Sequence, residues 1–169
     1  MVKAIIYTSQ TGFTRKYARL LAQETGLMAY ELGKAPGKIQ SDDPVIYMGW
    51  LKAGRLMGLD SALKQHRIAA VCAVGMGAQR QGGSQAQGVQ RMYRLDAVPV
   101  FYLQGGYDDT KLKGMNRFMM RCMAKMMVPK LERKKNPTEE EKEMLALFLH
   151  GGDRVDKKNL ASVLAWLRE

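Results

Sequence analysis

The chain has 169 residues, with 27 Lys and Arg against 16 Asp and Glu, and a formal net charge of +11. This length accommodates one domain with a sizeable core and excludes two comfortable ones, so we expect a single domain over residues 1–169. The positive charge favours an anionic partner, such as nucleic acid, anionic lipid or an acidic protein, and carries no information on the fold.

The cysteines and the distribution of apolar residues indicate the cellular compartment of the protein. Cys72 and Cys122 lie far apart, without the spacing of a zinc site or a disulfide framework, so we expect a reducing compartment and no metal centre. The first residues lack the apolar core of a signal peptide, and no run of about 18 apolar residues is present to span a bilayer. These features predict a cytoplasmic protein.

Short apolar runs alternate with helical patterns through the first two thirds of the chain. The expected strands cover residues 2–7, 28–32, 45–49, 68–74 and 99–103. The expected helices cover residues 14–25, 56–65 and a stretch through 90–95, and residues 75–87 are expected to form a loop. This alternation predicts an α/β fold with a doubly wound five-stranded parallel sheet and helices on both faces.

The last third of the chain has the pattern of three helices, which we expect at residues 111–128, 138–150 and 157–168. Thr138 and Glu141 have the spacing of a capping box, and Gly151 follows the same helix as a stop signal. Residues 110–150 are therefore expected to form a helical extension between the fifth strand and the last helix.

The sequence YTSQTGFT, between the first strand and the first helix, is rich in hydroxyl groups. Thr8, Ser9, Thr11 and Thr14 surround Gly12. A helix amino terminus offers unpaired N–H groups and a positive dipole end, so it binds a phosphate without a lysine. The Walker A and Rossmann glycine patterns are absent. The loop is a candidate phosphate site, and the alternative is a helix cap without a ligand.

The loop at residues 8–14 resembles the FMN phosphate-binding loop of flavodoxins. Two further segments, GWLKAGRL and FYLQGGYDDTKLKGMNRFMMRCMAKMM, are similar to the flavodoxin-domain branch that includes the menaquinone-dependent protoporphyrinogen oxidases. The resemblance covers most of residues 1–128. It implies a strand order of 2-1-3-4-5, with FMN bound outside the carboxyl ends of the strands.

The resemblance also implies which residues contact FMN. Residues 8–14 hold the phosphate, the loops at 49–54 and 105–108 line the isoalloxazine ring, and the loop at 77–82 approaches it. Trp50 and Tyr107 are placed to stack on the ring, although each has a core or sheet-end role as its alternative. No catalytic residue is assigned. The expected contacts are Thr8, Ser9, Gln10, Thr11, Gly12, Phe13, Thr14, Trp50, Leu51, Lys52, Ala53, Gly54, Gly77, Gly105, Gly106, Tyr107 and Asp108.

The expected helix at 111–128 is amphipathic. Its methionines fall on one arc, while Lys113, Arg117, Arg121 and Lys125 form a basic stripe on the other. Three interpretations stay open: the methionine face packs on the sheet, residues 111–135 lie on an anionic membrane, or the face binds a protein. Nucleic acid ranks below these three as a partner, because no base-reading module accompanies the cations.

The resemblance implies an FMN-binding redox protein that passes electrons to a partner protein or a quinone, in the cytoplasm or at the inner face of the membrane. Its flavin supplies the chemistry, so no catalytic acid or base is required. Two alternatives stay open. One is a protoporphyrinogen oxidase-like enzyme that reduces menaquinone, although the helix at 138–150 departs from the shorter tail of that branch. The other is a flavin-free binding or regulatory module.

Overall fold

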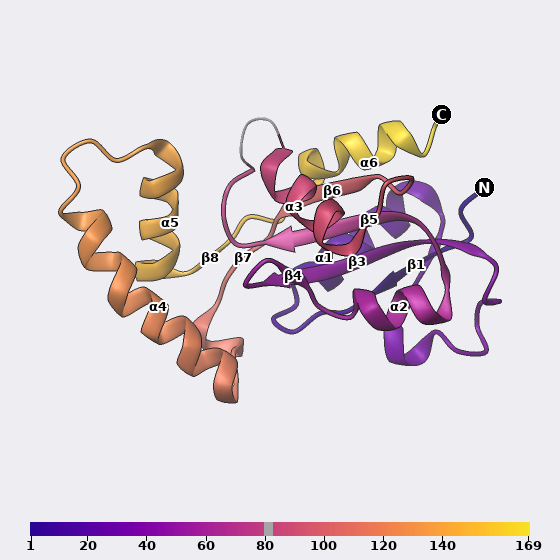
Figure 1. Ribbon diagram of the computed structural model, residues 1–169, viewed down its shortest axis with the longest axis horizontal. Helices are drawn as coiled ribbons and strands as arrows, with labels where there is room; N and C mark the ends of the chain where they lie inside the picture. Colours follow the sequence, from indigo (N-terminus) through magenta and orange to yellow (C-terminus); the bar gives the residue numbers. More distant parts are fainter. Residues whose placement is uncertain (80–82) are drawn as a thin grey trace.

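The computed structural model describes residues 1–79 and 83–169, and its central feature is a parallel sheet with helices on both faces (Figure 1). The parallel strands are β1 (Ala4–Tyr7), β2 (Met28–Glu31), β3 (Pro44–Lys52), β5 (Arg67–Gly75) and β6 (Val100–Gln104). They are ordered β2-β1-β3-β5-β6 across the sheet. Counted along the chain, this is the predicted order 2-1-3-4-5, so the doubly wound topology is confirmed.

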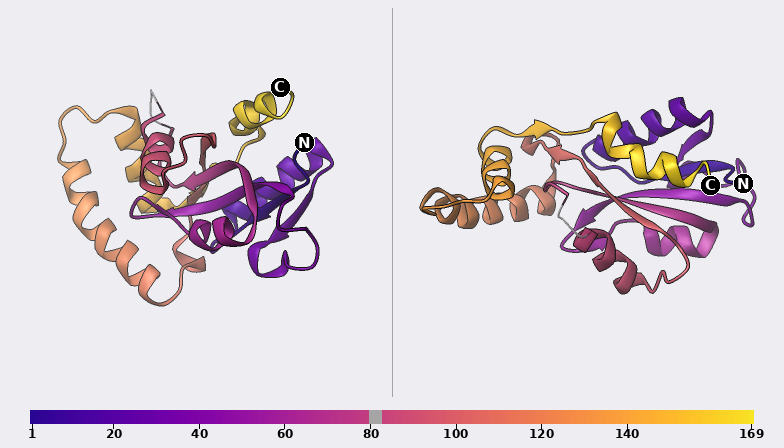
Figure 2. Two further views of the ribbon diagram at one scale, coloured as in Figure 1. Left: turned by 45° about the vertical axis from the view of Figure 1, so that its right-hand side comes forward. Right: turned by 90° about the horizontal axis from the view of Figure 1, so that it is seen from above.

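Alternate strand residues contribute to two separate cores, because parallel strands are buried on both faces. Ile5 and Ile46 pack with α1 and α6 on one face, whereas Ile6 and Tyr47 pack with α2 and α3 on the other. Figure 2 shows these helices on opposite sides of the sheet. The helices are α1 (Phe13–Thr25), α2 (Leu59–Gln65), α3 (Ser84–Tyr93) and α6 (Ala161–Trp166).

β3 continues through the segment that was predicted to be a loop at 49–54. It returns as the antiparallel strand β4 (Arg55–Leu56) after a turn in which Ala53 and Gly54 have φ values of 47° and 82°. Positive φ at both residues is typical of a two-residue hairpin turn, whose twist matches that of the strands.

Gly49 is the reason why the loop prediction was wrong. A Cβ atom at this position would lie 2.8 Å from the carbonyl oxygen of Met57 and 3.0 Å from the Tyr47 ring. The glycine thus allows the returning chain to approach the strand, and it does not end the strand as its type suggests.

Several helix boundaries also differ from the predictions. α2 begins at Leu59, after Gly58 in a left-handed conformation, and α3 begins at Ser84, inside the predicted loop at 75–87. Residues 80–82 of that loop lie outside the described residues. The last predicted helix is divided into the 3-10 helix η4 (Lys157–Leu160) and α6, and a second short 3-10 helix, η1 (Leu32–Lys34), follows β2.

The helical extension consists of α4 (Gly114–Glu132) and α5 (Glu139–His150), which pack against each other at the carboxyl-terminal end of the sheet (Figure 1). The predicted capping box is present, because Thr138 Oγ1 accepts from Glu141 N–H at 3.2 Å and Glu141 Oε2 accepts from Thr138 N–H at 2.9 Å. α4 begins three residues later than predicted, because Asp109–Lys111 forms the 3-10 helix η3.

A two-stranded sheet that was not predicted ties the extension to the parallel sheet. β7 (Gly106–Tyr107) follows β6 almost directly and pairs antiparallel with β8 (Gly152–Asp153), which follows α5. Both ends of the extension are therefore held at one point beside β6. Strands of two residues containing glycine have no alternation from which they could be predicted.

Tyr17 of α1 joins three distant parts of the fold, and its hydroxyl should contribute measurably to stability. The buried hydroxyl donates to the carbonyl oxygen of Gln104 and accepts from Asn159 Nδ2 at 2.6 Å. We expect Tyr17→Phe to lower the free energy of unfolding by about 1–3 kcal/mol, because it leaves buried partners unpaired. Urea denaturation measures the loss. Tyr30→Phe, at a half-buried tyrosine of β2, is the control, and an equal effect of both variants would contradict the assignment.

Candidate functional site

A cavity of about 260 Å³ lies at the carboxyl ends of the parallel strands. It is next to the point where the connections from β1 and β3 leave toward opposite faces, through α1 and α2 respectively. Ligands of doubly wound folds bind at such a switch point. The lining residues are Gln10, Thr11, Phe13, Trp50, Leu51, Lys52, Ala53, Val74, Gly75, Met76, Gly105, Gly106, Tyr107, Asp108, Leu112, Asn116, Met119, Met120 and Met123.

The hydroxyl groups of the loop at residues 8–14 do not all face this cavity. Thr11 lines it, whereas Ser9 Oγ accepts a hydrogen bond from Arg15 N–H at 3.3 Å and Thr14 is buried. Gly12 precedes α1 with a φ of 98°, a value that favours glycine, and as the N-cap residue it has no side chain to cap the helix. Ser9 takes the N–H of Arg15, so the N–H groups of Phe13 and Thr14 are the ones offered to an anion placed beside Thr11.

The Thr8 hydroxyl makes its hydrogen bond inside the protein, and Thr8 does not line the cavity. Its Oγ1 lies 2.9 Å from the hydroxyl of Tyr47, which donates to the Met57 carbonyl oxygen at 2.7 Å. Burial raises the pKa of Tyr47 to about 12, so this hydroxyl keeps its proton at neutral pH. Gly58 is required here, because a Cβ atom would collide with both hydroxyl groups.

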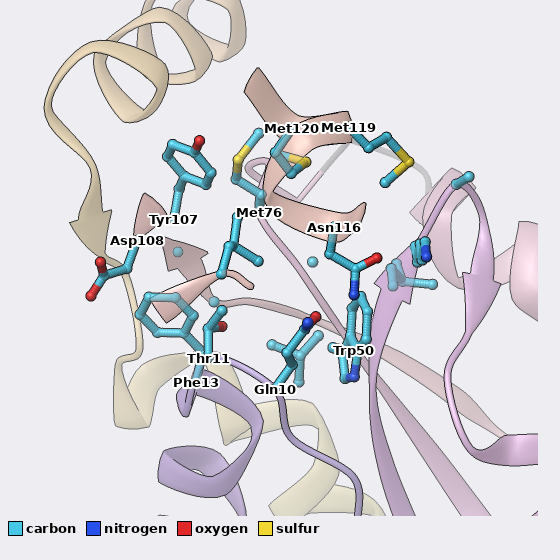
Figure 3. A pocket seen from close by; sticks show the side chains of 18 of the residues that line it. Gln10, Thr11, Phe13, Trp50, Met76, Tyr107, Asp108, Asn116, Met119 and Met120 are labelled. Atoms are coloured by element: carbon cyan, nitrogen blue, oxygen red, sulfur yellow. The ribbon is translucent and has the colours of Figure 1, made fainter. Parts of the chain in front are cut away.

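Most side chains that line the cavity are apolar, and a few are polar (Figure 3). Trp50 of β3 and Met76, after β5, lie on its walls, and Asn116 of α4 points toward Trp50 from above (Figure 3). Gln10 Oε1 is buried without a hydrogen-bond partner among the described residues. An unpaired buried acceptor next to an apolar cavity fits a flat aromatic ligand that carries N–H or O–H donors.

Tyr107 lines the cavity, but its ring is engaged elsewhere. It packs edge-on against Phe148 of α5 at 5.9 Å between ring centroids and belongs to a small core cluster with Leu112 and Leu147. Phe13 lies on the same side of the cavity and is held between Lys16 and Lys111, whose Nζ atoms are each 5.9 Å from its centroid. Trp50 is thus the aromatic ring of the predicted pair that is free to lie on a ligand.

Two predicted contacts line a different space. Gly54 and Gly77 border a neighbouring cavity of about 560 Å³, whose other walls include Met92 and Met144. Met76 and Leu51 line both cavities and separate them. The predicted loop at 77–82 is described only as far as residue 79, and its remaining part lies outside the described residues.

α4 covers the cavity, which the sequence did not reveal. Its methionine face was expected on the sheet, on lipid or on a protein, and part of that face, Met119, Met120 and Met123, lines the cavity together with Asn116. α4 packs mainly against α5, so the expectation that the face packs on the sheet is wrong. Asn116 could have served as a signal, because it is the one uncharged polar side chain in the run from Met115 to Met127.

Asp109 fixes the orientation of α4. Its carboxylate accepts from Arg117 Nη2 at 3.1 Å and from Arg121 Nη2 at 2.8 Å, so two turns of the helix are tied to the segment after β7. These hydrogen bonds, from Arg121 first and then from Arg117, lower the pKa of Asp109 to about 2. The neighbouring Asp108 accepts from Thr110 N–H at 3.1 Å and caps the start of η3.

We expect Asp109→Asn to loosen α4 over the cavity. Hydrogen exchange, corrected for its intrinsic pH dependence, should become several-fold faster in residues 114–125, with α1 unchanged. Because the folded pKa is lowered from 3.8, the wild-type protection should be complete above about pH 4 and be lost as the pH falls toward about 2. Equal protection in both proteins at neutral pH would contradict this role, and Asp60→Asn is the matched control, since Asp60 pairs with Arg55 of β4 and not with a residue of α4.

Among residues 1–79 and 83–169, no three His, Cys, Asp or Glu side chains are grouped as metal ligands. Within the same described parts, each helix is too short or too polar to cross a bilayer.

The strand order and a switch-point cavity joined to a glycine-containing hydroxyl loop define a doubly wound protein of the flavodoxin-like class. The model of the flavodoxin domain family matches residues 4–133, so the chain belongs to that family. Membership implies a flavin cofactor, and the orphaned Gln10 acceptor and apolar cavity fit one. Searches of the curated proteins and of the solved structures gave no match.

Proposed function

We propose that the protein binds FMN and carries electrons through it. The observation that carries this proposal is that one cavity joins Thr11, at the amino terminus of α1, to the apolar space beside Trp50. A molecule with a phosphate at one end and a flat ring at the other matches that shape and chemistry. When bound, FMN supplies the ability to accept and donate one or two electrons.

The chain would bind and orient this cofactor and would exclude water from it. Thr11 and the N–H groups after Gly12 would hold the phosphate. Gln10 Oε1 would accept a hydrogen bond from the cofactor, which satisfies a buried acceptor. Trp50 would lie against the ring, and Met119 and Met120 of α4 would cover it.

The net charge of +11 bears on the potential of the flavin. Reduction makes the ring anionic, and positive surroundings disfavour the anion less than the acidic surface of a typical flavodoxin does. Lys52 lines the ring cavity directly. A redox titration of the FMN complex should therefore place the final reduction step above that of acidic flavodoxins. A reduction potential as negative as that of acidic flavodoxins would contradict the proposal that a quinone or another higher-potential acceptor takes the electrons.

An apolar stripe on α4 supports a second candidate function, in which the protein works on a membrane. Met115, Phe118 and Met126 are 75 %, 65 % and 57 % exposed, and the exposed Cys122 lies between them on the same side of the helix. Lys125 and Lys130 are exposed near this stripe. We propose peripheral association of this cytoplasmic protein with an anionic membrane through residues 111–135, with menaquinone as acceptor in a protoporphyrinogen oxidase-like reaction.

Co-sedimentation with vesicles tests the membrane association. The protein should bind phosphatidylglycerol vesicles, bind phosphatidylcholine vesicles weakly, and detach as salt is raised. We expect Met115→Ser with Phe118→Ser to weaken binding by about tenfold or more, because two large apolar side chains no longer enter the lipid. Met28→Ser with Leu63→Ser removes exposed apolar groups elsewhere and is the control. Equal binding by both double variants would argue for a partner protein instead.

A flavin-free regulatory module is the candidate from another class. It would leave the Gln10 acceptor and the apolar cavity without a ligand. Failure to bind any flavin would favour it over both redox functions.

A further inference from the structure

A cationic cavity of about 520 Å³ lies beside the loop that precedes α1. Five of its lining residues are basic, and we call them the basic rim: Arg15, Lys16, Arg19, Lys111 and Lys113. None of the described residues that line this cavity is acidic. Gln10 and Thr11 line both this cavity and the flavin cavity, and Gly12 lines this one, so the basic rim adjoins the proposed phosphate seat.

The cations of the basic rim are only partly neutralised by the protein. Lys16 pairs with Asp153, and Lys111 pairs with Asp108 at 2.9 Å. Arg15, Arg19 and Lys113 are exposed and form no ion pair with any described residue. Like charges gathered around one cavity repel each other, and an anion placed among them removes that repulsion.

The flavin phosphate does not account for these charges. A single phosphate beside Thr11 is held by helix N–H groups and a hydroxyl and needs no cation. The basic rim borders that seat, because Thr11 and Gly12 line the same cavity, and its five cations exceed the charge of one phosphate monoester. It is built from two elements, the first turns of α1 and the segment around η3. Its position therefore corresponds to an anionic group that is attached to the first phosphate or lies next to it.

We propose that the basic rim binds the second phosphate of flavin adenine dinucleotide, so that the site accepts the dinucleotide as well as FMN. This inference rests on the proposed flavin function. The first phosphate occupies the seat beside Thr11, and the second follows one bridging oxygen further and enters the basic rim. The guanidinium groups of Arg15 and Arg19, one helical turn apart on α1, offer paired donors that match phosphate oxygens.

Flavin binding to a charge-neutralised variant tests the inference. The affinities of FMN and of the dinucleotide are measured by fluorescence quenching in the wild type and in the triple variant Arg15→Gln, Arg19→Gln, Lys113→Gln. Lys16 and Lys111 stay unchanged because they pair with Asp153 and Asp108 and both lie against the Phe13 ring. The control is Lys125→Gln, Lys130→Gln, Lys135→Gln, which removes the same charge from exposed positions on and after α4. Circular dichroism verifies that both variants fold.

We expect the rim variant to bind the dinucleotide roughly tenfold more weakly, with FMN affected less than about threefold and the control close to the wild type. Binding of FMN without binding of the dinucleotide would overturn the inference and leave the proposed function intact, and so would equal losses for both flavins. The basic rim would then face the carboxylates of an acidic protein. Binding of neither flavin would overturn the proposed function itself, and this inference with it.

Discussion

Thr11→Asp should abolish FMN binding, with a loss of affinity of about 100-fold or more. Among the described hydroxyl groups of the loop at residues 8–14, only that of Thr11 lines both the flavin cavity and the cationic cavity. The new carboxylate would take its place. Two unit charges at about 4 Å repel by about 4 kcal/mol near a protein surface, which exceeds two powers of ten in affinity. Fluorescence titration with FMN measures the loss.

Two comparisons separate charge from damage to the loop. The Asn side chain has nearly the same shape as Asp but no charge, so the FMN affinity of Thr11→Asn should fall by less than about tenfold. Riboflavin lacks the phosphate, so Thr11→Asp should leave its weaker binding unchanged. If Thr11→Asp bound FMN as well as Thr11→Asn does, the phosphate would not lie at this end of the cavity.

Gly106→Ala should cost about 1–3 kcal/mol of unfolding free energy and weaken flavin binding at the same time. A Cβ atom at Gly106 would collide with the Gly152 carbonyl oxygen and lie 2.9 Å from the Phe13 ring. The collision separates β7 from β8, and these strands hold both ends of the helical extension that covers the cavity. Urea denaturation and an FMN titration measure the two effects.

Gly88→Ala of α3 is the matched control for this glycine. A Cβ atom there meets nothing within 4 Å, so alanine should keep or raise stability, as is usual within a helix. A Gly106→Ala protein as stable as Gly88→Ala would show that β7 and β8 can separate without consequence for the sheet.

The parallel sheet was predictable because its central strands are apolar on both faces. Residues 45–48 and 70–74 are buried throughout, and such runs keep their signal in the sequence alone. The loop at residues 8–14 could also be recognised from the sequence as a candidate phosphate site, because it combines a glycine with several hydroxyl groups between a strand and a helix. The strand order followed from the family resemblance and the crossover rule.

The rest of the site depends on contacts that have no local pattern. The methionine pattern of α4 identifies an apolar face, but the direction of the helix is set by Asp109, which is eight residues away from Arg117. Likewise, a glycine such as Gly49 usually indicates the end of a strand. Here the strand continues, and the glycine is needed because the returning chain at Met57 passes close to it. Such partners are determined by tertiary structure, so Asn116 hinted that α4 faces a polar group but the pattern did not show which surface the helix covers.

Retention of FMN by the purified protein tests the central claim most directly. The protein is mixed with FMN and passed through a desalting column, and the visible spectrum of the eluted protein is recorded beside that of Thr11→Asp. We predict the absorption bands of oxidised flavin, close to one per chain, in the wild type and their loss in Thr11→Asp. A colourless wild-type protein that leaves all FMN on the column would contradict the flavin site and favour a flavin-free module.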